Sequence, residues 1–374
     1  MRSSEAASSS APRGANIRSD NQSTPAKAEA IQSIALVKQR FELLMAGNWA
    51  PSDPEKVFDL ALMPTFVAAE NARKPGLTLL ESAANLRLFL RSGCPPEGKR
   101  AILPLPGYEK HSVAADVRCF NGRTSVVVID PTTPKDYSSD NYRRSVLPGL
   151  SRSLPPNAVL TVIALDTQKA LMGCRIFSLS AASKLADHRV ALAAIHERNL
   201  SGALPITGNG NDASQVAQYG RVRVVDGAGV LPAAFYKHSQ SSSTLEAWLK
   251  ESSEDQAHVP VNSRNQTLLG RYQAHLTERY ASPYSVRQLS DQGMLEQVFP
   301  PQELERLRKP VRSNTSIEHK RLVFLDRAID HLRAQPESES RQLLARLRNF
   351  DISADNILSL NLVNQDFGPH PGTL

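Results

Sequence analysis

The stretch from Asp166 to Leu185 constrains the fold of this 374-residue chain more than any other. Just before it, residues 158–165 (AVLTVIAL) form an unbroken apolar run rich in β-branched residues, which is typical of a buried strand. After Gly173 the apolar residues recur at helical spacing, at Ile176, Phe177, Leu179, Ala182 and Leu185. The pattern therefore predicts a strand, a short loop and a helix whose first turn carries Cys174.

The position of Cys174 suggests a nucleophile. A thiol on the first turn of a helix lies in the positive field of the helix dipole and near unpaired N–H groups, and both favour the thiolate. Gln168, on the loop before Cys174, can turn its amide toward the group that the sulfur attacks. The alternative is a small core residue, which is the usual role of a lone cysteine near a helix start. A catalytic role requires a base and an orienting acid in a defined geometry.

Composition narrows the classes of partner. The three cysteines, Cys94, Cys119 and Cys174, are widely spaced and form no CxxC pair, so neither a disulfide framework nor a metal site is expected, and a reducing compartment fits. No apolar run approaches the roughly 20 residues that span a bilayer. The net charge of +7 comes without a long basic run, and aromatic residues make up 6% of the chain. A phosphorylated small molecule therefore fits better than nucleic acid as the anionic partner.

The chain divides into four regions. Residues 1–28 are rich in serine and lack an apolar block, which predicts a disordered leader without a Sec-type signal sequence. Residues 29–93 carry helical patterns, and the pattern changes to strands at the start of residues 101–260. Residues 261–374 are highly charged and mainly helical in pattern. We expect a catalytic core in residues 101–260 with helical flanks on both sides.

Helix start signals place the flanking helices. The first is expected from Glu29 to Met45, and the third from a capping box of Thr78 and Glu81 to Gly93. The second begins with Asp53 and Pro54. Further capping boxes are expected at Ser243 with Glu246 and at Thr315 with Glu318, the last followed by Lys320, Arg321 and Arg327. Residues 201–220 are expected to form an irregular loop.

A predicted β-hairpin supplies the partners that Cys174 needs. Asn121-Gly122, between an alternating segment and a β-branched run, is the strongest short-range hairpin signal. With these two residues as the turn, Asp130 lies opposite Val113. His111, two residues from Val113 and on the same face, is then a diagonal neighbour of Asp130 within reach of its side chain. This placement assumes a hairpin without a bulge.

The hairpin and the helix together suggest a triad of His111, Asp130 and Cys174. An imidazole whose N–H is held by a carboxylate has a fixed tautomer, which leaves its other nitrogen to act as a base. The alternatives are a surface or structural role for His111 and a simple strand end at Asp130-Pro131. The joint placement of acid, base and thiol favours the catalytic interpretation.

At these residues the sequence resembles the YopJ family of bacterial type III effectors, which are acetyltransferases. Four segments carry the likeness: MPTFVAAENARKPGL (63–77), GYEKHSVAADVRCFNGRTSVVVIDP (107–131), LDTQKALMGCRIFSLSAASKL (165–185) and LPAAFYKHSQS (231–241). The family is built on the fold of the ubiquitin-like-protein and adenovirus cysteine proteases, clan CE. The resemblance therefore implies an α/β (α+β) core with a central mixed sheet, and a helical regulatory unit formed by both flanks.

Carried over position by position, the resemblance implies a role for each site residue. His111 corresponds to the general base, Asp130 to the orienting acid, Cys174 to the nucleophile and Gln168 to the oxyanion-hole glutamine. Many members have glutamate in place of Asp130, whose side chain is one methylene shorter. The family also implies acetyl-CoA as donor and inositol hexakisphosphate as activator. The residues expected to bind these polyphosphates are Arg73, Lys237, Lys320 and Arg321, of which Lys237 resembles an autoacetylated lysine.

The implied function is a secreted effector that acetylates serine, threonine or lysine residues of host signalling or immune proteins, such as kinases, by a ping-pong mechanism. A serine-rich leader fits type III export into the host cytoplasm, with the nucleus left open. A cysteine protease of ubiquitin-like conjugates would use the same triad, but Ser112 and Arg175 stand where such proteases typically have tryptophan and glycine. A non-catalytic binder of a host protein is the third hypothesis.

Overall fold

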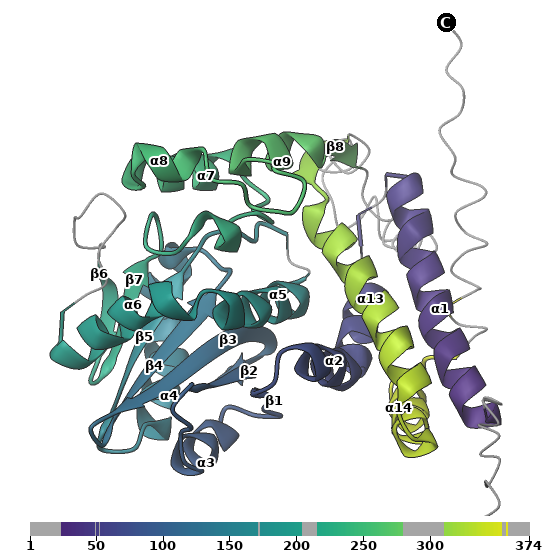
Figure 1. Ribbon diagram of the computed structural model, residues 1–374, viewed down its shortest axis with the longest axis horizontal. Helices are drawn as coiled ribbons and strands as arrows, with labels where there is room; N and C mark the ends of the chain where they lie inside the picture. The colour runs from purple at the N-terminus through teal and green to yellow at the C-terminus, as the bar shows by residue number, and fades with distance from the viewer. Residues whose placement is uncertain are drawn as a thin grey trace, which may run out of the picture.

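The computed structural model describes residues 24–48, 50–51, 53–170, 173–203, 215–279, 310–353 and 357. A seven-stranded mixed sheet forms its centre, in the order β1-β2-β3-β4-β5-β7-β6 (Figure 1). The strands are β1 (Leu77–Leu79), β2 (Lys99–Leu105), β3 (Tyr108–Phe120), β4 (Arg123–Asp130), β5 (Ala158–Ala164), β6 (Gln215–Tyr219) and β7 (Val222–Asp226). The predicted α/β class with a central mixed sheet is confirmed.

The β3–β4 hairpin has the predicted register. Its facing pairs run without a bulge from Phe120 with Arg123 to Ala114 with Ile129. Strand β5 then pairs parallel to β4, with Asp130 beside Ala164. Because the carboxyl ends of parallel strands lie at the same edge of a sheet, the end of the hairpin and the loop after β5 come together there.

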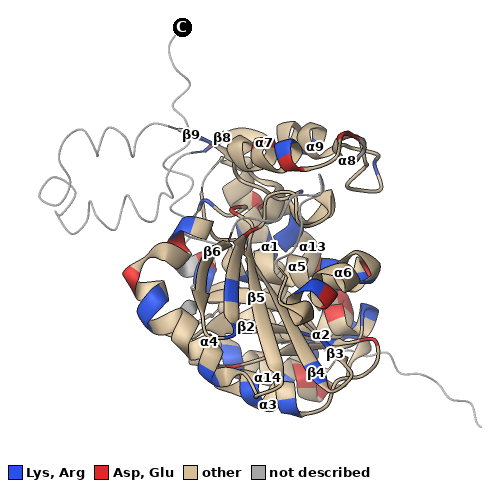
Figure 2. Ribbon diagram, turned by 90° about the vertical axis from the view of Figure 1, so that its left-hand side faces the viewer, with Lys and Arg blue, Asp and Glu red and all other residues tan. Residues whose placement is uncertain are grey.

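Both faces of the sheet are buried. Side chains from one face pack with helices α5 (Cys174–Asp187) and α6 (Arg189–Ser201), and those of the other face pack with α3 (Asn85–Arg91) and α4 (Leu147–Ser153). In Figure 2 strands β4 and β5 are almost free of charged residues except at their ends. Burial on both faces is the physical reason for the unbroken apolar run in β5.

The two flanks of the chain pack together. Helices α1 (Pro25–Ala46) and α2 (Asp53–Arg73) contact α13 (Ser316–Ala334) and α14 (Glu337–Asn349), and the purple and yellow-green helices lie side by side in Figure 1. Helices α2 and α13 also contact α5, the helix that begins with Cys174. Among the described residues, no helix is at once long enough and apolar enough to cross a membrane.

The third predicted N-terminal helix is present, but its predicted start at Thr78 is wrong. Residues 77–79 form the edge strand β1, which pairs parallel to β2, and helix α3 begins only at Asn85. Thr78 therefore lies in a strand and cannot cap a helix. Pairing with β2 prevailed over the local start signal, because an apolar–polar–apolar triplet fits a sheet edge as well as a helix.

Three other boundaries differ from the predictions. Helix α1 begins at Pro25, whose missing N–H costs nothing on a first helical turn, so residues 25–28 of the predicted leader are helical. Residues 1–23 lie outside the described residues. Within the predicted loop 201–220, β6 forms a hairpin with β7, and residues 204–214 lie outside the described residues. Helix α7 (Ser242–Glu251) has Ser241, not Ser243, at its N-cap.

The C-terminal flank contains a small sheet that the helical pattern did not predict. Strands β8 (Leu276–Arg279) and β9 (Val311–Asn314) pair between α9 (Leu268–Ala274) and α13. Thr315 occupies the N-cap of α13, but its hydroxyl donates to the carbonyl of His275. Glu318 accepts from Arg279 at 2.8 Å. The predicted capping box is therefore wrong, because the small sheet takes both side chains.

A buried ion pair joins the flanking helices. Arg321 of α13 donates two hydrogen bonds to Asp59 of α2, each 2.8 Å long, and its guanidinium lies 4.5 Å from the ring centroid of Phe41 in α1. Burial opposes the charge of Arg321, but the Asp59 carboxylate outweighs burial and raises the pKa of the guanidinium. Arg321 therefore lies inside the protein and not on a solvated face of its helix.

Replacing Asp59 tests how much the ion pair contributes to the stability of the protein. Asp59→Ala leaves Arg321 charged and unpaired in the interior, so we expect the free energy of unfolding to fall by about 3–5 kcal/mol. Asp330→Ala is the matched control, because Asp330 pairs with Arg333 on the exposed face of α13. This control is expected to cost less than about 1 kcal/mol in urea unfolding followed by circular dichroism. Equal losses in the two variants would contradict a structural role for the buried pair.

Candidate active site

The three candidate catalytic residues meet at one edge of the sheet. His111 lies near the start of β3, Asp130 ends β4, and Cys174 is the first residue of α5. His111 Nε2 lies 2.7 Å from Asp130 Oδ1. The side chains are nearly enclosed, with exposed fractions of 7% for His111, 0% for Asp130 and 8% for Cys174. The shorter side chain of aspartate therefore still reaches the imidazole.

Both oxygens of the Asp130 carboxylate are held. Oδ1 accepts the backbone N–H of Thr132 at 2.9 Å in addition to the contact with His111, and Oδ2 accepts the hydroxyl of Tyr137 at 2.6 Å. Burial and the neighbouring carboxylate raise the pKa of Tyr137 well above its usual value, so the phenol stays a donor. Tyr137 was missed by the sequence analysis because it lies in the irregular connection after β4, where no periodic pattern marks it.

The electrostatics favour an ion pair between His111 and Cys174. Burial alone lowers the pKa of His111, but the charge and hydrogen bond of Asp130, with a contribution from Cys174, raise it well above the usual value. Burial alone raises the pKa of Cys174, but hydrogen bonding and charge from His111, together with the backbone of Ser112, lower it. Because Nε2 faces Asp130, Nδ1 is the ring nitrogen that serves the sulfur. Both shifts favour a thiolate on Cys174 and an imidazolium on His111.

The start of α5 is fixed from two sides. Gly173 caps the helix with φ +99°, a conformation that glycine adopts without the cost that a Cβ imposes. A Cβ placed there would lie 3.9 Å from Nη2 of Arg321, so the buried ion pair of the flanks lies next to the residue before Cys174. The hydroxyl of Ser178 lies 2.6 Å from the carbonyl of Ser112 and 2.8 Å from that of Cys174. These contacts hold the sulfur beside β3.

Gln168 lies on the loop that connects β5 with α5. Its backbone N–H donates to the carbonyl of Pro131 at 2.9 Å, which places it at the same sheet edge as Asp130. Its side-chain amide donates to the carbonyl of Ala170 at 2.8 Å. The predicted oxyanion donor therefore stands on the correct loop, and its amide must turn to meet a developing oxyanion.

Several basic side chains, some of them buried, gather around the last turns of α5, and we call them the basic cluster. It consists of Lys184, Lys237, His238, Arg271 and Lys320. Burial lowers the pKa of Lys184 well below its usual value, and the charges of Lys237, Lys320 and Arg271 lower it further. Burial, with the charges of Arg327 and Lys237, lowers the pKa of Lys320 to about 7. The cations therefore destabilise one another in the absence of an anion.

His238 lies among the same basic side chains. Its exposed fraction is 2%, and neither ring nitrogen has a hydrogen-bond partner within the described part of the chain. Burial, followed by the charge of Lys184, lowers its pKa well below the usual value, so burial and the neighbouring cations favour the neutral imidazole.

The four residues predicted to bind polyphosphates do not form one group in the structure. Lys237 and Lys320 belong to the basic cluster and are partly buried. Arg73 ends α2, is about half exposed and pairs with Glu70 at 3.2 Å. Arg321 does not fit its predicted ligand-binding role, because its two hydrogen bonds to Asp59 engage it inside the helical flanks.

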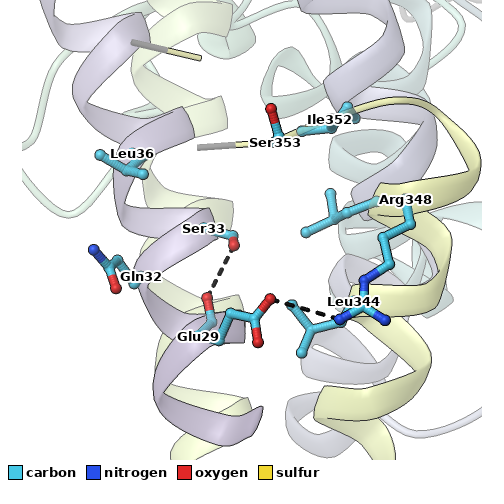
Figure 3. A pocket seen from close by; sticks show the side chains of 9 residues that line it. Glu29, Gln32, Ser33, Leu36, Leu344, Arg348, Ile352 and Ser353 are labelled. Atoms are coloured by element: carbon cyan, nitrogen blue, oxygen red, sulfur yellow. Dashed lines mark hydrogen bonds and ion pairs between the residues drawn. The ribbon is translucent and has the colours of Figure 1, made fainter. Parts of the chain in front are cut away.

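A separate groove lies between α1 and α14 (Figure 3). Leu36 and Leu344 line it from opposite helices, and Arg348 lies 3.8 Å from Glu29 across it. None of the candidate catalytic residues lines this groove. Among the described residues, no group of three or more histidine, cysteine, aspartate or glutamate side chains is arranged to hold a metal ion.

Comparison with known proteins identifies similar sequences. The family model described as YopJ Serine/Threonine acetyltransferase matches residues 31–327. The serine/threonine-protein acetyltransferase YopJ of Yersinia pestis is 25% identical over 232 residues, which cover 60% of this chain and 75% of YopJ. The serine/threonine-protein acetyltransferase HopZ1a of Pseudomonas syringae pv. syringae is 28% identical over 214 residues, which cover 51% of this chain and 57% of HopZ1a.

Solved structures share the fold. HopZ1a in complex with IP6 and CoA matches with a TM-score of 0.61 and 22% identity, over 84% of this chain and 99% of that chain. AvrA delL154 with IP6 and CoA matches with a TM-score of 0.58 and 21% identity, over 82% of this chain and 99% of that chain. The fold of this chain is therefore one already seen in experimental structures.

The ion pair predicts how alkylation of Cys174 depends on pH. In a Cys94→Ser, Cys119→Ser background, the rate with iodoacetamide is expected to fall, as the pH is lowered, only at a pH below that at which an ordinary thiol loses its reactivity, because the pKa of Cys174 is lowered. Asp130→Asn removes the charge that stabilises the imidazolium, so the pKa of Cys174 rises and the decline moves to higher pH. Exposed Cys119, measured in a Cys174→Ser protein, is the reference thiol. Identical profiles for Cys174 with and without the Asp130 carboxylate would refute the ion pair.

Proposed function

We propose that this chain, which belongs to the YopJ family of serine/threonine acetyltransferases, transfers acetyl groups from acetyl-CoA by way of a thioester on Cys174. The observation that carries the proposal is the convergence of Asp130, His111 and Cys174 at one sheet edge. The lowered pKa of the thiol and the raised pKa of the imidazole supply a nucleophile at neutral pH.

The first half-reaction loads the enzyme. The thiolate of Cys174 attacks the thioester carbonyl of acetyl-CoA, and a tetrahedral oxyanion forms. The backbone N–H of Cys174 at the start of α5 and the turned amide of Gln168 donate to this oxyanion. The intermediate collapses as the bond to the CoA sulfur breaks, and the imidazolium of His111 gives its proton to the departing thiolate. The acetyl group remains on Cys174 as a thioester, and His111 is left neutral.

The second half-reaction unloads the enzyme. The hydroxyl of an acceptor serine or threonine approaches the thioester, and neutral His111 takes its proton as the oxygen attacks the acetyl carbonyl. The same two donors stabilise the second oxyanion. Its collapse expels the Cys174 thiolate and regenerates the ion pair with the imidazolium. Asp130 stays a carboxylate throughout and holds the ring in one orientation.

The basic cluster fits inositol hexakisphosphate as an activating ligand. The structures of HopZ1a and AvrA that share this fold contain IP6 and CoA. In this chain, Lys184, Lys237, Arg271 and Lys320 would hold the phosphates, and the unpartnered His238 would donate to one of them. Arg73, at the end of α2, remains available for the second polyphosphate, CoA. Because Lys184 and Cys174 lie on the same helix, α5 links the ligand site with the nucleophile.

The wider biology follows from the family as a proposal. Helices α1, α2, α13 and α14 of the two flanks form the regulatory unit, and the central sheet with the helices packed on it forms the catalytic core. The acceptors are host signalling or immune proteins, such as kinases, and lysine is a second acceptor type beside serine and threonine. Export by a type III system delivers the protein to the host cytoplasm. A nuclear destination has no support from the fold or from the relatives.

Incubation with labelled acetyl-CoA and inositol hexakisphosphate tests the reaction. The wild-type protein is expected to label itself or a kinase substrate, and Cys174→Ala is expected to abolish labelling. Gln168→Ala removes one oxyanion donor and is expected to slow labelling by roughly 100- to 1000-fold. In parallel, the same proteins are incubated with a fusion of a ubiquitin-like protein as a protease substrate. Cleavage of the fusion without acetyl transfer would replace the proposal with the protease alternative.

Binding of inositol hexakisphosphate is expected to be linked to protonation of Lys320. Its pKa of about 7 leaves part of the amine neutral at neutral pH, and a bound polyanion raises that pKa, so Lys320 takes up protons on binding. Affinity therefore rises as the pH falls through 7. Calorimetry in two buffers of different ionisation enthalpy measures the uptake, which Lys320→Gln is expected to reduce.

Arg73→Gln is the matched control for proton uptake, because an arginine keeps its proton in proteins. This variant removes one positive charge near the end of α2 without removing a group that titrates near neutral pH. Its proton uptake is expected to equal that of the wild type, even where the affinity is lower. An unchanged uptake in Lys320→Gln would contradict the assignment of Lys320 to the polyanion site.

A further inference from the structure

Gln240 holds the loop that leads into the catalytic helix. Its side-chain Oε1 accepts hydrogen bonds from two backbone N–H groups, those of Lys169 at 2.8 Å and Ala170 at 2.9 Å. Its own backbone N–H donates to the carbonyl of Thr167 at 2.9 Å. A single residue from a distant segment of the chain therefore fixes the backbone on both sides of Gln168.

The opposite side of the loop is fixed by the end of β4. The backbone N–H of Gln168 donates to Pro131, and that of Asp166 donates to Thr132, each at 2.9 Å. The loop thus lies between the residues that follow Asp130 and the side chain of Gln240. The Gln168 amide rests on the carbonyl of Ala170, the residue whose N–H Gln240 accepts. The position of that amide therefore depends on the clamp that Gln240 provides.

We propose that Gln240 is a positioning residue for acetyl transfer, whose side-chain oxygen fixes the loop so that the Gln168 amide can reach the oxyanion. The inference rests on the proposed function, since it assumes that Gln168 acts as an oxyanion donor. Lys169 and Ala170 are exposed, so water can replace Gln240 as the acceptor for their N–H groups. Loss of the clamp therefore affects the geometry of the loop and leaves the fold intact.

Two substitutions of similar length isolate the acceptor. Gln240→Met removes the oxygen, and a misplaced donor is expected to lower kcat by about 10- to 100-fold with little change in the KM for acetyl-CoA. Gln240→Glu keeps an oxygen that accepts the same two N–H groups and is expected to retain most of the activity. The melting temperatures of both variants are expected to match that of the wild type. A wild-type kcat in Gln240→Met, or an equal loss in Gln240→Glu, would overturn the role.

A double variant shows whether Gln240 acts through Gln168. In a Gln168→Ala background the donor is already absent, so Gln240→Met is expected to cause no further loss of kcat. If the fold losses of kcat caused by Gln168→Ala and Gln240→Met multiply in the double variant, Gln240 does not act through Gln168. Hydrogen exchange of the Lys169 and Ala170 amides tests the clamp without any turnover. Faster exchange is expected in Gln240→Met but not in Gln240→Glu, and equal exchange in both would overturn the clamp.

The results separate this inference from the proposed function. If the wild type transfers acetyl groups and Gln240→Met does so at the same rate, the positioning role is overturned and the proposed function stands. If exchange shows the clamp but the wild type transfers no acetyl group, the proposed function fails. The positioning role of Gln240 in catalysis fails with it, because there is no oxyanion for Gln168 to meet.

Discussion

The site depends on the interaction between the carboxylate of Asp130 and the ring of His111. Asp130 is fully buried, and burying a carboxylate costs free energy unless its oxygens accept hydrogen bonds. This one accepts from a backbone N–H at Thr132, from the hydroxyl of Tyr137 and from the ring of His111. The protein backbone and a phenol thus hold the carboxylate in place, and the ring of His111 is the only partner among these three contacts that can carry a positive charge. A positive charge on that ring in turn favours a thiolate on Cys174.

The flanks and the core share one helix. Cys174 begins α5 beside the sheet edge, and Lys184 lies in its last turns within the basic cluster. Arg321, paired with Asp59, packs the flanking helices against the residue that caps α5. The fold therefore sets a stable ion pair near the nucleophile and a group of mutually repelling cations at the other end. An anion bound at these cations would relieve that repulsion, and this relief is the physical basis of the proposed activation by a polyphosphate.

The features of the fold that depend on local chemistry could be predicted from the sequence. The turn at Asn121-Gly122 sets the register of the hairpin, and this register is enough to predict that His111 lies beside Asp130. The apolar run of β5 and the start of α5 followed from periodicity. Tyr137 was missed because it lies in an irregular connection without a periodic pattern, and Gln240 was missed because its contacts with Lys169 and Ala170 join segments far apart in the chain. No pattern in a single segment reports such contacts.

The errors have the same origin. Thr78 and Thr315 both carry a helix start signal, but one joined the edge of the main sheet and the other gave its hydroxyl to His275. Arg321 has the sequence context of a surface residue on a charged helix, and only packing against α2 shows that it is buried. Tertiary contacts therefore decided the outcome wherever a short polar motif had two uses of similar energy.

The most direct measurement is the mass of the intact protein after brief exposure to acetyl-CoA and an acid quench. A nucleophile held as a thiolate by His111 and Asp130 should add one acetyl group, on Cys174, as a thioester that hydroxylamine removes. The adduct should be absent from Cys174→Ser and strongly reduced in His111→Ala. A stable adduct that resists hydroxylamine, or one that forms equally well without His111, would contradict a catalytic ion pair at this edge of the sheet.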